Sequence, residues 1–492
     1  MIGTSPSEYL FIRACVFFLR AITPLCLLYW VARFVRPAAF RAPVVIDLWT
    51  AAEALFYLLF YVPRKYHLLQ RAALHPPALS RDQRWRLFER CSTNIPDYER
   101  YLRGWFNDAP LSEIKRENLK EFLTWAFLNT GDVAEMSDDE FERYIRDIEK
   151  RLGSEIETGR GNAKCLRLSL DKVSMSHRSL IWYLCVFVVD TIASTRLSYY
   201  KFLYYRTSHR HFFSVFPLRP HNLFAKNRTP SNSITYWYRP HTAEKKLPIV
   251  FIHGIGIGLY PYVNFLREIN ACSTSIGNDD VGIIALEIMP ISFRITSPVM
   301  QKEQMCAEIN RILNAHGWDK FILASHSYGS VISTHMLHSP TISPKIASVL
   351  LIDPVTFLLH LPDVAYNFMS RKPARANEHQ LSYFASKDMG VAHTLSRCFF
   401  WSDNIMWKDD LAGRDATVSL AGRDLIVDTQ TVGAYLVDRH LKAADDSWKG
   451  RRWVGRGVDV LWFAGLDHAQ VFDGLVDRAK LIDVLKEYCR RI

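Results

Sequence analysis

Paired cysteines are missing from this sequence. Its nine cysteines are odd in number and widely spaced, and no Cys-x-x-Cys pair occurs among them. This pattern excludes a disulfide framework and the usual zinc-binding spacings. Several cysteines lie inside apolar runs, where a free thiol behaves as a small hydrophobic side chain. The cysteines therefore favour an intracellular, reducing compartment or burial in a membrane over secretion.

Blocks of like charge are missing as well, although the formal net charge is +11. The basic residues are scattered and no nucleic-acid motif accompanies them, so we expect no nucleic-acid partner. The pair His335 and His338 has no obvious carboxylate or third ligand, so we predict no metal, and we also predict no cofactor. A basic surface next to apolar segments favours binding to an anionic membrane face.

Three apolar runs precede residue 200. Ala14–Ala32 has nineteen residues with one charge, Arg20, which is the length needed to cross the hydrocarbon core of a bilayer. Val44–Val62 contains two acidic residues, so an interfacial or buried helix is as compatible with it as a span. Ser179–Ala193 is short for a span, and we expect a packed or re-entrant helix there. We therefore predict membrane attachment through residues 1–62.

The region that follows is charged and helical in character. Residues 112–127 and 137–152 place apolar side chains three and four positions apart, which predicts amphipathic helices. We expect residues 63–216 to be α-helical and to include the third apolar run at 179–193.

The pattern changes after Pro217. Short apolar strand-like runs alternate with helical stretches, which is typical of a mostly parallel sheet with helices on both faces. We therefore predict an α/β domain over residues 217–492. The interval at about 356–415 is too long for a plain loop and rich in aromatic residues, so we expect an inserted helical cap. The expected strands are Ile234–Arg239, Pro248–His253, Val281–Ile288, Phe321–Ser325, Ser348–Asp353, Ala416–Ala421 and Val458–Ala464.

One of these strands leads into a tight turn. Phe321–Ser330 (FILASHSYGS) predicts a strand, a sharp turn centred on Ser327, and the start of a helix. A nucleophile on such a turn needs small residues two positions before and after it, here Ser325 and Gly329. The segment resembles the nucleophile turn of the α/β-hydrolase superfamily, in its lipase and esterase branch, with Ser325 where the common pattern has Gly. The resemblance covers residues 217–492 and implies an α/β-hydrolase fold with Ser327 as the nucleophile.

The resemblance extends to a glycine-rich loop. Pro248–Gly258 is an apolar strand ending in His-Gly and further glycines, similar to the oxyanion loop of the family. Acyl transfer needs two backbone N–H groups directed at the oxygen of the tetrahedral intermediate. The resemblance implies that Tyr328 supplies one and that Ile255 or Gly256 supplies the other, with Ile255 preferred. His253 belongs to this loop and is a poor candidate for the base.

The family places its base after the last strand, where this sequence has His468. Asp424 follows the preceding strand and completes the chain order Ser, Asp, His, so we favour it as the acid. Asp353, one strand earlier, is the alternative acid, because some lipases place the acid there. Asp467, next to the base, fits a loop carboxylate better.

Together these residues favour a membrane-associated serine hydrolase that cleaves a lipid or another hydrophobic carboxylic ester through an acyl-enzyme. The same residues can instead transfer the acyl group to an alcohol or catalyse a lyase reaction, because the fold does not dictate the acceptor. A non-catalytic membrane scaffold is the third possibility. It is disfavoured because every expected catalytic position is filled.

Overall fold

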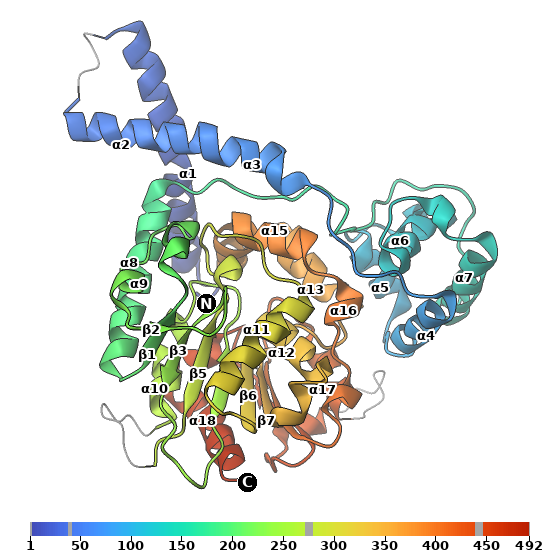
Figure 1. The fold of residues 1–492 in the computed structure, drawn as a ribbon. Helices are drawn as coiled ribbons and strands as arrows, with labels where there is room; N and C mark the ends of the chain where they lie inside the picture. Colours follow the sequence, from blue (N-terminus) through green and yellow to red (C-terminus); the bar gives the residue numbers. More distant parts are fainter. Residues whose placement is uncertain (1, 38–41, 271–278, 438–445, 492) are drawn as a thin grey trace.

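A computed structural model describes residues 2–37, 42–270, 279–437 and 446–491 of the chain. Within these residues, a nine-stranded sheet lies at the centre and helices cover it (Figure 1). The strands are β1 (Leu203–Arg206), β2 (Asn227–Arg228), β3 (Thr235–Arg239), β4 (Ile249–Ile252), β5 (Ile283–Glu287), β6 (Phe321–His326), β7 (Ile346–Ile352), β8 (Asp415–Ala421) and β9 (Val458–Phe463).

The strand order is β2-β1-β3-β5-β4-β6-β7-β8-β9. The strands from β5 to β9 in this order are parallel, while β3 is antiparallel to β5 and β1 is antiparallel to β3. The fold is therefore the expected α/β type, and each of the seven expected strands is present. Strands β1 and β2 were not predicted, and β1 lies upstream of the boundary expected at residue 217. Both are short, and their positions are set by pairing with distant segments.

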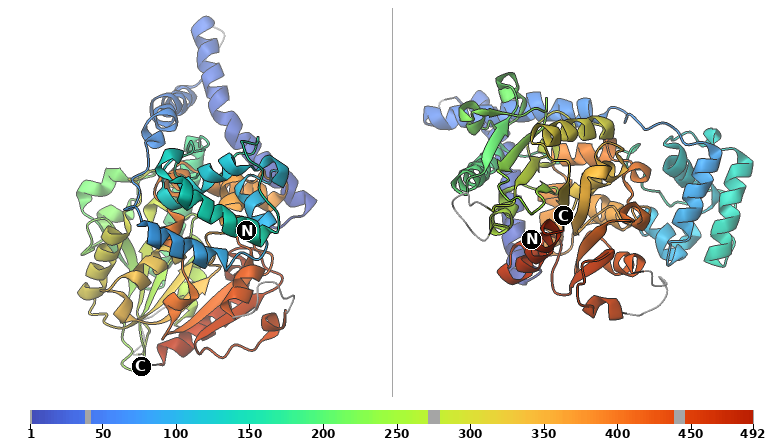
Figure 2. Two further views of the ribbon diagram at one scale, coloured as in Figure 1. Left: turned by 90° about the vertical axis from the view of Figure 1, so that its right-hand side faces the viewer. Right: turned by 60° about the horizontal axis from the view of Figure 1, so that its bottom comes forward.

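Helices cover both faces of the sheet (Figure 2). Along β4, Ile249 and Phe251 belong to one buried apolar cluster, and Val250 and Ile252 to the cluster on the opposite face. Burial on both faces explains why the central strands are continuously apolar. One face carries α8 (Leu180–Tyr199), α10 (Val263–Glu268) and α18 (Leu475–Cys489), and the other carries α11 (Lys302–Ala315), α12 (Gly329–His338) and α17 (Thr429–Leu436).

The chain between β7 and β8 is largely helical and lies over the carboxyl ends of the parallel strands. This is the segment expected as a cap, and its aromatic side chains pack inward on the main apolar cluster. Its helical elements are α13 (Asp363–Ala365), η9 (Tyr366–Ser370), α14 (Ala376–Gln380), η10 (Leu381–Ser386), α15 (Met389–Arg397), α16 (Trp401–Asn404) and η11 (Lys408–Leu411).

A bundle of four helices stands beside the cap, at the right of Figure 1. Its apolar faces meet around Leu102 and Tyr144, which are fully buried. Salt bridges join the bundle to the α/β domain, including those from Arg100 to Asp363 and to Asp428. The helices are α4 (Arg81–Ser92), α5 (Tyr98–Trp105), α6 (Arg116–Leu128) and α7 (Asp138–Leu152).

Among the described residues, three helical segments are long and apolar enough to cross a membrane: Pro6–Val35, Val44–Gln70 and Leu180–Tyr199. The first is α1, and the second comprises α2 (Val44–Leu55), the π-helical η1 (Phe56–Tyr61), α3 (Val62–Tyr66) and η2 (Leu68–Gln70). The third is α8, whose Asp190 forms salt bridges with Arg219 (2.9 Å) and Arg294 (2.6 Å). One face of α8 is therefore packed on the α/β domain.

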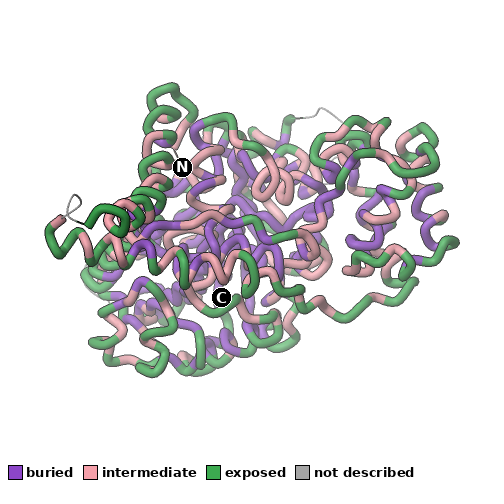
Figure 3. The backbone as a smooth tube through the Cα atoms, turned by 90° about the horizontal axis from the view of Figure 1, so that it is seen from above, coloured by how far each residue is buried: buried purple, intermediate pink, exposed green. Residues whose placement is uncertain are grey.

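Helix α1 has a docked half and a protruding half. Near its start, the ring of Tyr9 packs against His379, and the Arg20 guanidinium lies over the ring of Tyr383 in the cap. Its second half extends away from the domain beside α2 (Figure 1), and much of it is coloured as exposed in Figure 3. Many of the exposed residues are apolar. We call this protruding part, from Pro24 to Leu55, the hairpin.

The two acidic residues of α2 turn toward α1 and not toward the surroundings. Asp47 accepts hydrogen bonds from Tyr29 (2.5 Å) and Arg33 (2.8 Å). Glu53 is fully buried and accepts a hydrogen bond from the hydroxyl of Thr23 (2.7 Å). The second oxygen of Glu53 accepts a hydrogen bond from the N–H of Leu180 at the start of α8 (2.8 Å). The outer surface of the hairpin is apolar because both carboxylates bond to protein groups on its inner side.

Candidate active site

Ser327 occupies the turn between β6 and α12. Its φ of +50° lies in the left-handed region, which non-glycine residues seldom adopt. Steric crowding explains why the residue two positions after Ser327 is a glycine. A Cβ on Gly329 would lie 2.5 Å from the carbonyl oxygen of Ile252. Ser325, which replaces the usual glycine, is fully buried and its hydroxyl accepts a hydrogen bond from Ser333 (2.8 Å). The tight packing of the turn holds Ser327 in its strained conformation.

The structure brings Ser327, His468 and Asp424 together from the ends of three strands. The Ser327 hydroxyl lies 2.8 Å from His468 Nε2, and His468 Nδ1 lies 2.7 Å from Asp424 Oδ2. The other oxygen of Asp424 accepts hydrogen bonds from the backbone N–H groups of Ile426 (2.8 Å) and Val427 (3.0 Å). These bonds fix the carboxylate, and the carboxylate in turn fixes the orientation and tautomer of the imidazole.

Asp353, the alternative acid, is buried close by but does not contact the imidazole of His468. Its two oxygens accept hydrogen bonds from the backbone N–H groups of Ala421 (3.1 Å) and Ala469 (2.8 Å). Burial raises the pKa of this carboxyl to about 7, although the neighbouring imidazole opposes the shift. The geometry therefore gives Asp424 the position of the acid and gives Asp353 the position of a support for the His468 loop.

The carboxylates around His468 control its charge. Burial alone would lower the pKa of the imidazole, but Asp424, Asp353 and Asp467 outweigh burial and raise the pKa to about 9. The site therefore stabilises an imidazolium, which is the species formed when the histidine takes a proton from a serine hydroxyl.

The glycine-rich loop lies directly against the nucleophile turn. A Cβ on Gly254 would lie 2.7 Å from the Cβ of Ser327. Among the described residues, the backbone N–H groups of Tyr328 and Ile255 have no protein acceptor, whereas that of Gly256 donates to the carbonyl of Ile291 (3.1 Å). Tyr328 and Ile255 are thus available as oxyanion donors. Gly256, the second choice from the sequence, is not available in this arrangement because the turn at Ile291 uses its N–H.

Two neighbours of the site have structural explanations. His253 Nδ1 bonds to the carbonyl of Gly254 (2.7 Å), its Nε2 accepts from the N–H of Ile288 (3.0 Å), and burial lowers its pKa to about 4. Asp467 accepts hydrogen bonds from the N–H groups of Leu425 and His468 and from the side chain of Asn377. Both residues hold loops in place, as the sequence suggested.

A buried pair that the sequence did not predict joins the two loops. The Tyr262 hydroxyl accepts a hydrogen bond from the N–H of Gly254 (3.2 Å) and lies 2.8 Å from His326 Nδ1. His326 is the residue before the nucleophile, and burial keeps its pKa well below the ordinary range, so it is neutral. The pair fixes the distance between the glycine-rich loop and the nucleophile turn. No motif in the sequence pointed to Tyr262.

One group of residues has the spacing of a metal site in the described part of the chain: Asp353, Asp424 and His468. All three already bond to protein groups, as described above. The pair His335 and His338 does not converge on a common point, because His335 bonds to Asn404 and His338 to Asp410.

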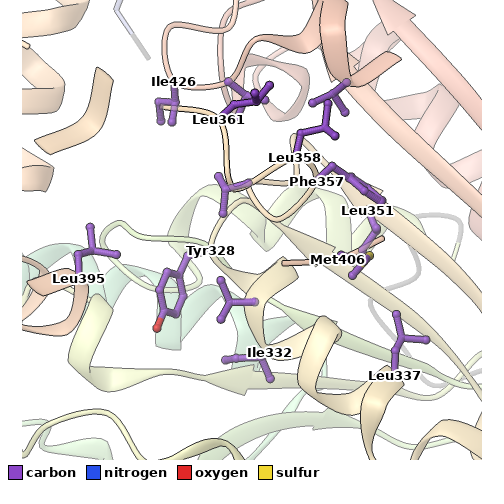
Figure 4. Close-up of a cluster of buried hydrophobic side chains, with 14 of the residues drawn as sticks. Tyr328, Ile332, Leu337, Leu351, Phe357, Leu358, Leu361, Leu395, Met406 and Ile426 are labelled. Atoms are coloured by element: carbon purple, nitrogen blue, oxygen red, sulfur yellow. The ribbon is translucent and has the colours of Figure 1, made fainter. Parts of the chain in front are cut away.

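A narrow apolar cavity begins at Ser327. Tyr328 and Ile255 form its wall next to the nucleophile. Leu395 and Ile426, which Figure 4 shows on the same side as Tyr328 in the apolar cluster, belong to the part contributed by the α/β domain and its cap. Its free volume is about 50 Å³. The opposite wall comes from the helical bundle, through Trp105 and Trp125, and from Leu168, which follows α7. No sequence motif indicates that the bundle reaches the site, because this contact exists only in the tertiary fold.

The sequence model of a family described as alpha/beta hydrolase fold matches residues 248–455. The match includes Ser327 and Asp424 and agrees with the strand order and the turn seen here. The chain therefore has an α/β-hydrolase fold. Curated protein sequences gave no match to it.

Several solved structures are similar to this α/β-hydrolase at low sequence identity. A bacterial membrane phospholipase A is 11% identical, with a TM-score of 0.39 over 64% of this chain and 94% of its own. A carboxylesterase from Nitrososphaera gargenis is 13% identical, with a TM-score of 0.36 over 54% and 98%. An esterase from Thermogutta terrifontis is 12% identical, with a TM-score of 0.36 over 52% and 94%.

Proposed function

We propose that this α/β-hydrolase is a membrane-associated serine hydrolase that cleaves carboxylic esters of lipids or other hydrophobic molecules. The proposal is supported above all by the continuous contact from Ser327 through His468 to Asp424, at 2.8 Å and 2.7 Å. A serine hydroxyl bonded to an imidazole that is itself oriented by a fixed carboxylate is the arrangement that activates serine as a nucleophile.

The acylation step follows from these positions. His468 Nε2 accepts the proton of the Ser327 hydroxyl as the serine oxygen attacks the ester carbonyl. Asp424 and the neighbouring carboxylates stabilise the imidazolium, in keeping with the raised pKa of His468. The N–H groups of Tyr328 and Ile255 stabilise the negative oxygen of the tetrahedral intermediate. The imidazolium then gives its proton to the leaving alcohol, and the acyl group remains on Ser327.

Deacylation repeats the same steps with water as the nucleophile. His468 removes a proton from the water, which attacks the acyl-enzyme, and the acid leaves as Ser327 regains its proton. The apolar cavity at Ser327 favours a hydrophobic ester, because an apolar wall offers no partner for a polar substituent.

The hairpin supports membrane association. Exposed apolar side chains cover it on both helices, including Phe34, Val35, Val44 and Val45. The protruding half of α1, Pro24–Val35, is roughly 18 Å long at about 1.5 Å per residue. This is shorter than the hydrocarbon core of about 30 Å. Because the protruding part is this short, we propose that the hairpin inserts into one leaflet. The remaining half of α1 contacts the cap along one side and also exposes large apolar side chains, including Leu10 and Phe17.

A comparison of purified wild type with Ser327→Ala tests the proposed function. Full-length protein in detergent should release free acid from hydrophobic esters, and Ser327→Ala should reduce this release by several orders of magnitude. Product analysis with and without an added alcohol separates hydrolysis from acyl transfer. Equal acid release by both proteins would contradict the proposal, and exclusive formation of a new ester would replace it with acyl transfer.

A further inference from the structure

The cavity at Ser327 has walls from two parts of the chain. The near wall consists of residues from the α/β domain and its cap, such as Val355 and Leu359. The far wall includes Trp105 of α5 and Trp125 of α6, which lie outside the residues 248–455 that the family model matches. The helical bundle therefore contributes directly to the surface that a bound substrate would meet.

Three tryptophans on the cavity wall have their indole N–H groups occupied by the protein. With these donors occupied, the rings offer only carbon surface to an occupant, so the wall suits an apolar group. The same bonds tie the bundle to the cap, since two of them cross between these parts. The bonds run from Trp105 to the carbonyl of His360 (3.0 Å), from Trp401 to the carbonyl of Ala126 (2.9 Å), and from Trp125 to the hydroxyl of Ser169 (2.9 Å).

A second apolar cavity lies on the bundle side of these tryptophans. It shares Trp105, Trp125 and Trp401 with the first cavity and is lined mainly by residues of α4, α5 and α6. The free volumes of about 50 Å³ and 20 Å³ leave room for only a few water molecules. Two narrow apolar spaces in series fit a slender, unbranched chain better than a broad ring system.

The position of the base shows which part of an ester the first cavity accepts. The leaving alcohol receives its proton from His468 Nε2, so it departs on the His468 side of Ser327. Tyr328 and Ile255 line the cavity, whereas His468 and Asp424 do not. The cavity therefore extends from Ser327 on the side of the acyl group.

We propose that helices α5 and α6 form the distal part of an acyl-chain site. A linear acyl chain attached to Ser327 runs along the faces of Trp105 and Trp125 toward the interior of the bundle, and Trp125 limits its length. The substrates are then esters of unbranched fatty acids whose chain length is limited by the space in front of Trp125. This inference rests on the proposed ester hydrolysis at Ser327, and it adds that residues outside the matched family region determine chain length.

Trp125→Ala in the full-length protein is the direct test. Hydrolysis of p-nitrophenyl esters from C4 to C16, and of the benzoate, is measured in the same detergent micelles. The ratio of kcat/KM for C16 to that for C4 should rise about tenfold or more in Trp125→Ala, because removing the indole lengthens the space for the chain. Trp125→Phe should give an intermediate ratio. A ratio cancels differences in the amount of folded enzyme between variants.

Trp85→Ala is the matched control. Trp85 also belongs to the bundle and stacks on Tyr144, but it lines neither cavity. It should leave the C16 to C4 ratio at the wild-type value. An unchanged ratio in Trp125→Ala, an equal change in Trp85→Ala, or a gain for the benzoate alone would overturn the acyl-chain site while leaving ester hydrolysis intact. Failure of the wild type to cleave any of these esters would overturn the proposed function itself.

Discussion

The Asp353 carboxylate accepts a hydrogen bond from the backbone N–H of Ala469 at 2.8 Å, one residue beyond the imidazole that Asp424 contacts. Ala469 has a φ of +68°, so the chain turns sharply at the point where Asp353 holds it. Two buried carboxylates thus act on the same loop in different ways. Asp424 orients the ring of His468, and Asp353 anchors the backbone that carries this ring.

The two carboxylates should respond differently to neutralisation. Asp424→Asn should reduce kcat by about 10⁴-fold, because an amide at this position favours the wrong tautomer of His468. Asp353→Asn keeps an oxygen and the shape of the side chain, so it should reduce kcat by no more than about tenfold and mainly lower the free energy of unfolding. Steady-state kinetics measure kcat of both variants, and thermal unfolding measures their stability. The reverse ranking in kcat would make Asp353 the acid.

The pH dependence of kcat/KM should reflect the carboxylates around His468. The imidazole must be neutral to accept the serine proton, and its pKa is raised from 6.5 to about 9. Activity should therefore rise with pH, with an ascending limb above the range of an ordinary histidine. Asp353→Asn removes one of the charges that raise this pKa, so the limb should move to lower pH. If the ascending limb of the kcat/KM profile of Asp353→Asn stays at the same pH or moves to higher pH, this view of the site is wrong.

Two glycines near the nucleophile should differ in their tolerance of a methyl group. Gly329→Ala places a Cβ 2.5 Å from the carbonyl of Ile252, so it should destabilise the protein by about 2 kcal/mol and displace Ser327. Gly256→Ala meets no atom within 4 Å and keeps its N–H bond to Ile291, so stability should change by about 0.5 kcal/mol or less. Chemical denaturation and activity measurements check the pair. Equal effects would mean that the turn is not as tightly packed as described.

The hairpin should hold the protein on membranes. Full-length protein should remain in the pellet after carbonate extraction. A variant with Phe34, Val35, Val44 and Val45 all changed to Asp should move largely to the supernatant, since each buried charge costs about 2.5 kcal/mol or more in the bilayer. In the control variant, Leu475 and Val476 are changed to Asp. These residues are equally exposed at the start of α18, and this variant should stay in the pellet. Retention of the hairpin variant would place the anchor elsewhere, for example on α8.

The parts of the site that the sequence predicted are those set by short-range pattern. Ser327 lies in a strand-turn-helix segment whose small residues could be identified directly. The positions of Asp424 and His468 after the last two strands were implied by the resemblance to the α/β-hydrolase family. The choice between Ile255 and Gly256 needed tertiary information. It depends on whether the turn at Ile291 uses the N–H of Gly256, and nothing in the local sequence indicates that contact.

The remaining features depend on contacts between distant segments. Strand β1 has only four residues, and pairing with β3 determines its position. The acidic residues of α2 made an interfacial or buried helix as compatible with the sequence as a span. Asp47 bonds to α1, and Glu53 bonds to α1 and to the start of α8, so the outer face of the hairpin remains apolar. The contribution of Trp105 and Trp125 to the cavity likewise follows from docking of the bundle on the cap, which periodicity alone does not predict.

Covalent labelling with a fluorophosphonate tests the central claim most directly, because the probe reacts only with a serine activated by its neighbours. Wild-type protein should form one adduct, and peptide mass spectrometry should locate it on Ser327. Ser327→Ala should show no adduct while its circular dichroism spectrum and unfolding temperature stay close to wild type, and His468→Ala should label far more slowly. No adduct on correctly folded wild type, or an adduct that persists on another serine in Ser327→Ala, would contradict the assignment of Ser327 as the nucleophile.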